Sequence, residues 1–228
     1  MLALLLTVSL ASADPAPLGA EDLIGRMKGA WDRLSTYRTT QLVQERVKGD
    51  LGPEQRIKVA FRKPWEIQLE WETLHPGRKV YWSAARHGGE VQVYPGGFAG
   101  RAVGILSFSL DNRLLKGDTN YSPADGGFGY LVKLVSSSVA PSSPHRPTLA
   151  EPVASTVGSD RTWTLAMTDV QHPRFVRTEL LVSATTGLPR RFTAWAADGA
   201  LAERYEWFDT VIDPVLVDSV DFSSGYPQ

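Results

Sequence analysis

The amino-acid sequence predicts an α+β domain with one large, curved antiparallel sheet, an N-terminal helix and one or two central helices. Three observations predict this fold. The chain has 228 residues, which suits one domain. Segments along most of its length alternate apolar and polar residues with period 2, which is typical of antiparallel strands with one buried face. Helical spacing is confined to one segment near the N-terminus and one in the middle.

The composition excludes several classes of protein. Hydrophobic residues make up 43% of the chain and charged residues 21%, which are ordinary globular values. The 24 basic and 25 acidic residues give a net charge of −1, so no basic field attracts a nucleic-acid backbone. Cysteine is absent, which rules out disulfides, thiolate metal sites and a cysteine nucleophile. We therefore expect no nucleic acid, metal or cofactor.

The first segment is predicted to be an export signal. Residues 1–13 form an uncharged apolar run that ends in a small-x-small pattern, so cleavage is expected after Ala13. Residues 14–20 follow as a linker, and residues 21–228 as a single domain. The segment carries no Lys or Arg before its apolar run, and a buried N-terminal helix is the alternative. The protein is expected in the periplasm, exported and soluble.

A helix is predicted next, over Glu21–Leu34. Its apolar residues follow one helical stripe, and two acids occupy the first turn, where the helix dipole favours them. The stripe consists of Leu23, Ile24, Met27, Trp31 and Leu34.

The period then changes to 2, and five strands are predicted before the middle of the chain. They cover 39–48, 54–63, 65–72, 78–83 and 90–94. In the third, Trp65, Ile67, Leu69 and Trp71 alternate with glutamate and glutamine, which indicates one dry and one wet face. Glu66, Glu70 and Glu72 are therefore expected on a solvated face.

The middle of the chain is less periodic. Gly96–Gly100 lacks the flanking β-α-β pattern of a dinucleotide loop and is predicted to be a turn over the sheet edge. A helix is predicted to start at Ser122, with Pro123 in its first turn. Residues 136–152, rich in Ser and Pro, are predicted to be a loop between two halves of one sheet.

Four strands complete the predicted sheet, and the total is about nine. They cover 162–167, 175–182, 188–196 and 201–208. Asp198-Gly199 predicts the hairpin between the last two.

No catalytic constellation emerges from the sequence. Nucleophile elbows, zinc-protease motifs and phosphate loops are absent, and the four histidines share no metal-type spacing. An enzyme would need titratable groups clustered in a cavity, and the sequence indicates none. A non-enzymatic protein is predicted.

An apolar, aromatic-rich face is the strongest candidate site. It either packs as a core against the helices or lines a cavity suited to acyl chains, and the sequence leaves both open. The candidate lining residues are Ile57, Val59, Phe61, Trp65, Ile67, Leu69, Trp71, Trp82 and Trp163.

Several short motifs resemble a known family. They are Trp31–Tyr37, Gln44–Gly49, Phe61–Pro64, Gly77–Trp82, Thr186–Arg190, Asp198–Leu201, Tyr205–Asp209 and Val217–Phe222. Together they resemble the LolA-like superfamily of periplasmic lipoprotein carriers, and more closely an uncharacterised bacterial family with that fold. The resemblance implies a partly open barrel that holds lipid between a concave sheet and lid helices. It also implies that Lys63, with Arg62 beside it, takes part in cargo handling, although Lys replaces the Arg of the carriers.

Two functions follow as hypotheses. The first is a periplasmic carrier that holds the acyl chain of a lipid or lipoprotein, acts as a monomer and meets an inner- or outer-membrane partner protein. The alternative is an envelope-assembly or sensor module that binds a protein partner through its sheet, without lipid.

Overall fold

The computed structural model describes residues 18–213 except residue 118. The predicted signal segment 1–13, most of the linker 14–20 and the motif at 217–222 lie outside the described residues. The described N-terminal half contains α1 (Ala20–Arg33), β1 (Thr36–Val47), β2 (Asp50–Leu51), β3 (Gln55–Arg62), β4 (Glu66–Trp71), β5 (Lys79–Ser83), η1 (His87–Gly89), β6 (Val91–Tyr94), α2 (Gly97–Val103), β7 (Leu106–Phe108) and η2 (Arg113–Lys116). The second half contains η3 (Pro123–Asp125), α3 (Gly127–Ser138), β8 (Thr148–Leu149), β9 (Val153–Val157), β10 (Asp160–Thr168), β11 (Arg177–Ser183), β12 (Pro189–Trp195) and β13 (Leu201–Ile212).

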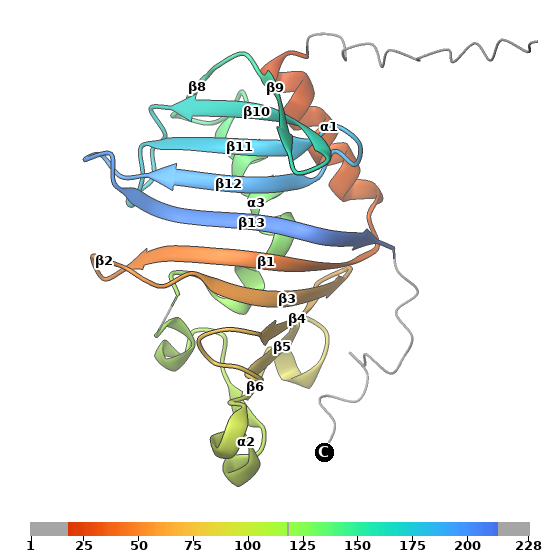
Figure 1. The fold of residues 1–228 in the computed structure, drawn as a ribbon, viewed down its shortest axis with the longest axis vertical. Coiled ribbons are helices and arrows are strands. Elements are labelled where there is room, and N and C mark those ends of the chain that lie inside the picture. Colours follow the sequence, from red (N-terminus) through yellow and green to blue (C-terminus); the bar gives the residue numbers. More distant parts are fainter. Residues whose placement is uncertain (1–17, 118, 214–228) are drawn as a thin grey trace, which may run out of the picture.

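One curved antiparallel sheet of 13 strands forms the body of the described chain. Its order is β7-β6-β5-β4-β3-β1-β13-β12-β11-β10-β8, with β2 paired to β1 and β9 to β10. The sheet runs from β8 at one end to β7 at the other, and α1 and α3 lie on the same face of it (Figure 1). It stays open, with β7 and β8 at its ends, so the predicted fold class is confirmed.

The two halves of the chain meet at the pairing of β1 with β13. β13 is the last described strand, yet it lies in the middle of the sheet, between β1 and β12. The start of β1 is tied to the end of β13, because the Ser35 and Thr36 amides donate to Asp213 Oδ1 at 2.9 and 2.8 Å. This register places Glu45 of β1 directly opposite Glu203 of β13.

The helix α1 packs as its apolar stripe predicts. Leu23, Ile24, Met27 and Ala30 are buried against the concave face of the sheet, and Glu21 and Asp22 stay exposed in the first turn. The helix ends where Lys63 Nζ donates to the carbonyl oxygens of Trp31 and Asp32 at 2.6 and 3.0 Å. A cation at this end also suits the helix dipole.

An aromatic cluster joins α1, α3 and the sheet. The Phe61 ring on β3 lies 5.2 Å from those of Trp31 and Tyr37, and the Tyr37 ring lies 4.5 Å from that of Phe128 on α3. Such ring pairs stabilise a core beyond their buried area. At this end of the sheet the concave face is therefore packed with side chains.

The nine predicted strands all exist, and the described strands that the sequence did not predict are short. These are β2, β7, β8 and β9, of 2, 3, 2 and 5 residues. Segments of two or three residues are too short to display a period of 2. Their existence depends on pairing with a neighbouring strand.

The predicted loop at 136–152 is confirmed only in part. α3 continues to Ser138, and Thr148–Leu149 forms β8, so the irregular backbone covers 139–147 and 150–152. The serines do not end the helix because Ser137 and Ser138 donate their hydroxyls to carbonyl oxygens one turn back.

Two further predictions need correction. Glu66 is buried rather than solvated, and its carboxylate lies 3.2 Å from Arg86, which compensates its charge. Gly96–Gly100 is not only a turn, because α2 begins at Gly97. The missing side chain of Gly100 allows α2 to lie against the Tyr94 ring, since a Cβ there would come within 2.6 Å of a ring carbon.

Candidate functional site: a cavity between the sheet and its helical cover

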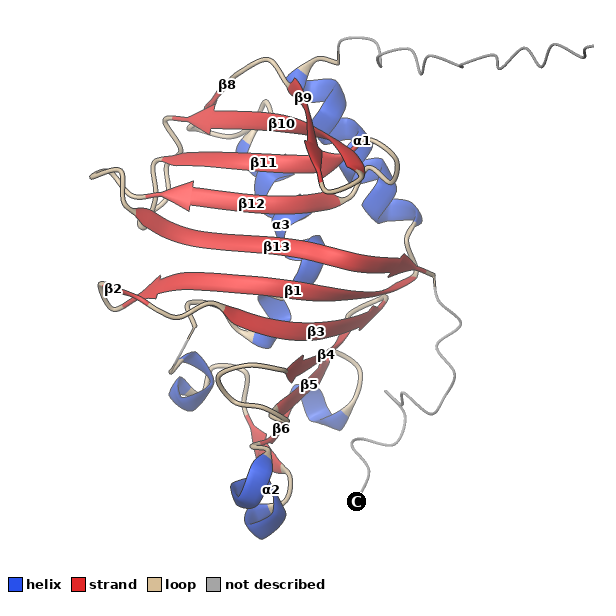
Figure 2. Ribbon diagram, viewed as in Figure 1, coloured by secondary structure: helices blue, strands red, loops and turns tan. Residues whose placement is uncertain are grey.

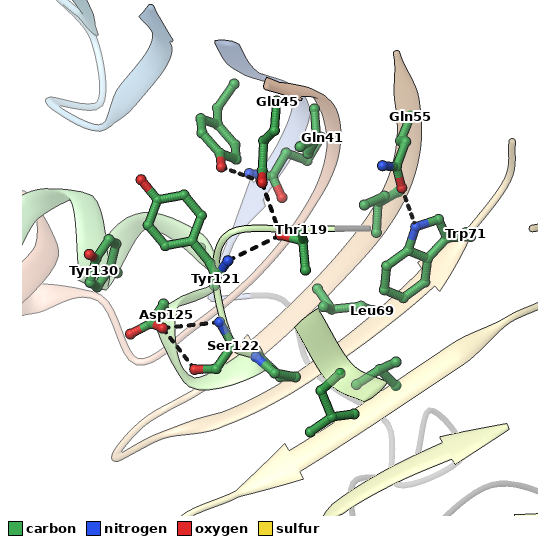
Figure 3. A pocket seen from close by; sticks show the side chains of 18 of the residues that line it. Gln41, Glu45, Gln55, Leu69, Trp71, Thr119, Tyr121, Ser122, Asp125 and Tyr130 are labelled. Atoms are coloured by element: carbon green, nitrogen blue, oxygen red, sulfur yellow. Dashed lines mark hydrogen bonds between the residues drawn. The ribbon is translucent and has the colours of Figure 1, made fainter. Parts of the chain in front are cut away.

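A cavity of about 320 Å³ lies between the concave face of the sheet and the segment 117–134 that crosses it. Its floor comes from strands β1, β3, β4, β5, β6, β7, β12 and β13, and its cover from residues of η2, η3, α3 and the segment between η2 and η3. The volume is at the lower end of the range typical of small-molecule sites. Figure 3 shows the cavity with the side chains of the cover facing those of the sheet.

One part of the cavity is apolar. Its lining includes Ile57, Leu69, Trp71, Val80, Val93, Leu106, Phe108, Leu114 and Leu115. Trp71 is oriented by a 2.8 Å hydrogen bond from its indole Nε1 to Gln55 Oε1, visible in Figure 3. This bond satisfies the indole N–H and leaves the ring to line the cavity.

The predicted lining residues separate into two groups. Ile57, Leu69 and Trp71 line the cavity, whereas the remaining six do not. Val59, Phe61 and Ile67 are buried in the core, as are Trp82 on β5 and Trp163 on β10, and Trp65 packs against that core.

The boundary between packed core and cavity lies partway along strand β4. Side chains of one face alternate with period 2, so Ile67, Leu69 and Trp71 project to the same side of β4. The Ile67 end of this face is covered by the start of α3, where a Cβ at Gly126 would lie 2.7 Å from Ile67 Cδ1, while Leu69 and Trp71 line the cavity. Core and cavity are therefore both present on one strand, at different positions.

Lys63 and Arg62 lie outside the cavity lining. Lys63 caps α1, and its ammonium lies 4.8 Å from the centre of the Trp31 ring. Arg62 Nη1 lies 4.0 Å from the Glu66 carboxylate. Lys63 thus attaches the helix α1 to the start of the β3–β4 turn.

The other part of the cavity is polar and contains two buried carboxylates. Glu45 and Glu203 face each other across the β1–β13 pair, and both line the cavity. Tyr121 donates its hydroxyl to Glu203 Oε1 at 2.7 Å, and Arg174 Nη2 lies 3.4 Å from Glu203 Oε2. Tyr205 donates its hydroxyl to Glu45 Oε1.

Glu45 attaches the cover to the sheet. Its Oε2 accepts the Asn120 amide at 2.7 Å, and its two oxygens accept the Thr119 hydroxyl, each at 3.1 Å. The Asn120 side chain donates to the Arg46 carbonyl at 3.1 Å. Charge-assisted bonds of this kind are stronger than neutral ones, so a single glutamate holds residues 119–120 in place.

The burial of Glu203 and Tyr205 raises the pKa of both groups. Glu203 is 1% exposed, and burial, followed by the like charge of Glu45, raises its pKa from 4.5 to about 7, against the lowering effects of Arg174 and Tyr121. Burial also raises the pKa of the Tyr205 phenol, with Glu45 and Glu203 adding to the rise.

A smaller second cavity, of about 280 Å³, adjoins the first. Leu134 of α3 and Phe192 of β12 line both cavities and therefore separate them. The second is also lined by His172, whose ring stacks on Phe175 with 3.8 Å between centroids. Burial, followed by the charge of Arg174, lowers the His172 pKa to about 4.

Sequence reasoning missed the polar part of the cavity. The statement that no titratable groups cluster in a cavity is wrong for Glu45, Glu203, Tyr121 and Tyr205. One signal was available: Glu203 shares a face with Tyr205 and Trp207, and a glutamate on an aromatic face of a strand indicates a buried acid. The contribution of Tyr121 had no such signal, because its segment is irregular.

Over residues 18–213 without 118, no group of three or more histidines and acids could hold a metal ion. In the same part of the chain, no helix is both long enough and apolar enough to span a bilayer.

The described chain, an open, curved antiparallel sheet with helices on its concave face, has a LolA-like fold. The chain belongs to the family described as "Protein of unknown function (DUF1571)", whose model matches residues 34–228. The predicted resemblance to a bacterial family with a LolA-like fold is therefore confirmed. None of the curated proteins matches the chain.

Solved structures with the same fold come from distant relatives. An uncharacterized conserved protein from Thermus thermophilus is 13% identical, with a TM-score of 0.53 over 92% of this chain and 94% of its own. MucB is 18% identical, with a TM-score of 0.52, and the match covers 88% of this chain and 61% of MucB. Lipoprotein LppX of Mycobacterium tuberculosis is 11% identical, with a TM-score of 0.50 over 87% and 100%. Identities this low indicate a shared fold alone.

Proposed function

We propose that the chain is an exported, periplasmic binding protein that holds an amphiphile, a lipid or the acyl chain of a lipoprotein, in the cavity beneath α3. The observation that supports this most is the division of the cavity into an apolar part over β3–β7 and a polar part at β1 and β13. An acyl chain fits the first, and a polar head group fits the second.

Burial of an acyl chain would supply enough free energy for measurable binding. Burying an acyl chain contributes about 0.8 kcal/mol per methylene. About ten methylenes would then contribute roughly 8 kcal/mol, from which the cost of ordering the chain is subtracted. Binding in the micromolar range or weaker is therefore expected.

A non-enzymatic role is part of the proposal. Glu45 accepts hydrogen bonds from Thr119, Asn120 and Tyr205, so its oxygens are already occupied by the chain's own donors. Glu203 is held between Tyr121 and Arg174. These contacts favour a role for both carboxylates in holding the structure around the cavity over a role in catalysis.

The second candidate is a module that binds a protein partner through its sheet. This candidate is supported by a crystal structure of MucB, which has the same fold, in complex with MucA(peri). This candidate requires no lipid in the cavity.

The test is binding of a fluorescent fatty acyl probe, together with native mass spectrometry of protein purified from an envelope fraction. The wild type should bind the probe and carry lipid. Leu69→Glu should abolish probe binding, because a carboxylate beside an acyl chain is costly to desolvate. Leu51→Glu is the matched control, since Leu51 is exposed on β2 and does not line the cavity.

A wild type that binds no probe and carries no lipid would overturn the proposal and leave the protein-binding module. Equal binding by the Leu69→Glu and wild-type proteins would overturn the assignment of the site. Circular dichroism of both variants verifies that each remains folded.

A further inference from the structure

The end of the sheet that carries α2 exposes a group of large apolar side chains. We call this group the apolar tip; it consists of Phe98, Val103, Ile105 and Leu106. Phe98 is 87% exposed and Val103 55%. In Figures 1 and 2, α2 lies beyond β6 at the extreme end of the molecule, away from α1. Isolated exposed apolar residues are ordinary, but four within nine residues on a projecting element are not.

The exposure of Phe98 follows from how α2 is seated. Gly100, two residues further along, is buried against the Tyr94 ring of β6, so close that a Cβ would lie 2.6 Å from it. The helix thus presents its glycine to the sheet. Phe98 lies on a different side of the helix and is directed to solvent.

The apolar tip borders the opening of the cavity. Leu106 lines the cavity and is also exposed, and the same is true of Leu114 on η2, which is 75% exposed. A side chain that both lines a cavity and contacts solvent lies at its mouth. The tip and the mouth therefore form one continuous apolar surface through Leu106.

The segment that forms this surface is basic in sequence. Between residues 95 and 117 the sequence has Arg101, Arg113 and Lys116 against Asp111 alone. Arg101 on α2 and Arg113 beside Leu114 are exposed, and neither forms an ion pair with a residue that the structure describes. The rest of the chain balances this excess, since the whole molecule has a net charge of −1.

We propose that the apolar tip docks on an anionic lipid bilayer and thereby places the mouth of the cavity at the membrane surface. This inference deepens the proposed function, on which it rests. Apolar side chains that project beside basic ones suit the head-group layer, where the former enter the acyl boundary and the latter meet lipid phosphates. A narrow projection has little area for a stable protein interface, whereas a bilayer needs only a few inserted side chains.

The first test is sedimentation with vesicles of phosphatidylcholine, with and without a third of phosphatidylglycerol. The wild type should bind the anionic vesicles, and binding should weaken as salt is raised. Phe98→Asp should lower the partition coefficient at least tenfold, and Arg101→Gln about fivefold, since one basic residue near an anionic surface contributes about that much. Val153→Asp is the matched control, because Val153 is 64% exposed on β9, at the other end of the sheet.

The second test uses the absence of cysteine. Phe98→Cys creates a single thiol for an environment-sensitive fluorophore, and Val153→Cys places the same label on β9. Anionic vesicles should shift the emission of the label at 98 to the blue, and brominated acyl chains should quench it. The label at 153 should change in neither experiment.

Three outcomes would overturn the proposal: no binding of the wild type to anionic vesicles, equal partition of the Phe98→Asp and wild-type proteins, or equal spectral shifts at 98 and 153. Measuring acyl-probe binding by the wild type and by Phe98→Asp distinguishes a failure of membrane docking from a failure of the proposed function. If the variant binds the probe but not the vesicles, docking and cargo binding are separate. If neither wild type nor variant binds the probe, the proposed function fails by itself.

Discussion

Glu203 is a buried carboxylate with both an opposite and a like charge nearby. It lies on the concave face of β13, contacts Tyr121 and Arg174, and faces Glu45 across the strand pair. Like charges directly opposite each other destabilise a strand pair. The interactions of the cover with both carboxylates offset part of this cost.

A pH dependence of stability follows from the raised pKa of Glu203. The native state binds the proton more tightly than the unfolded state, so this group contributes stability below its ordinary pKa of 4.5 that is lost as pH rises through about 7. We expect Glu203→Gln to be more stable than wild type above pH 7, by up to about 3 kcal/mol, and the difference to shrink toward pH 4.5.

Urea denaturation of both proteins at several pH values between about 4.5 and 8 measures this difference. Glu90→Gln is the control, because Glu90 is exposed and should show no such trend. A stability difference for Glu203→Gln that does not change with pH would contradict the effect of burial on this carboxyl.

Leu69 tests the distinction between core and cavity. Truncation of a side chain that faces open space removes contacts on one side only, so Leu69→Ala should cost less than the roughly 2–5 kcal/mol of a packed core leucine. Leu180→Ala, at a fully buried position on β11, should fall within that range. Equal losses of free energy of unfolding for the two variants would mean that Leu69 is packed as tightly as Leu180.

At the residue scale, the sequence predicted which face of β4 is apolar but not what covers it. The period of 2 places Ile67 and Leu69 on one side. Whether a helix or open space lies above each depends on where α1 and α3 cross the sheet. The contact of Glu45 with Thr119 spans 74 positions and leaves no periodic trace in the sequence.

Among the elements, α3 is the one whose position determines the cavity. Its first residue, Gly127, has φ +77°, and a Cβ there would lie 2.0 Å from the Tyr37 hydroxyl oxygen. The next amide, that of Phe128, donates to the same oxygen at 3.2 Å. The start of the helix is therefore fixed against β1 by backbone that only glycine accommodates.

We expect Gly127→Ala to destabilise the protein by about 2 kcal/mol or more, because the strain of positive φ adds to the steric clash with Tyr37. The measurement is the free energy of unfolding in urea, together with acyl-probe affinity, which should fall as α3 shifts. Gly25→Ala in α1 is the matched control, since a Cβ there meets nothing within 4 Å. That variant should be neutral or more stable by about 0.5–1 kcal/mol.

The sequence predicted elements best where periodicity extended over many residues. The helix α1 and the long strands β1, β3, β10 and β13 were all predicted, because each repeats its pattern several times. The helix α2 was not predicted, because four glycines at 96, 97, 100 and 104 disfavour helix. Its packing on Tyr94 overrides that propensity.

For the whole molecule, a single domain over residues 21–228 stays a prediction, and it can be tested at the 139–147 connection. A site for a sequence-specific protease can be inserted after Ser142, which lies in an exposed part of this segment. After cleavage we expect the two fragments to elute together and to unfold in one transition, because β1 and β13 pair across them. The uncleaved variant is the control, and fragments that separate and unfold independently would indicate two domains.

The position of β13 also has a consequence for how the protein is made. A chain that leaves a ribosome or an export pore with its N-terminus first presents β1 long before residues 201–212 are available to pair with it. Until then both β1 and β12 have an unpaired edge in the middle of the future sheet, and such edges promote association between chains. The sheet is therefore completed only after synthesis or export has reached β13. A delay before β13 emerges would therefore favour aggregation over folding.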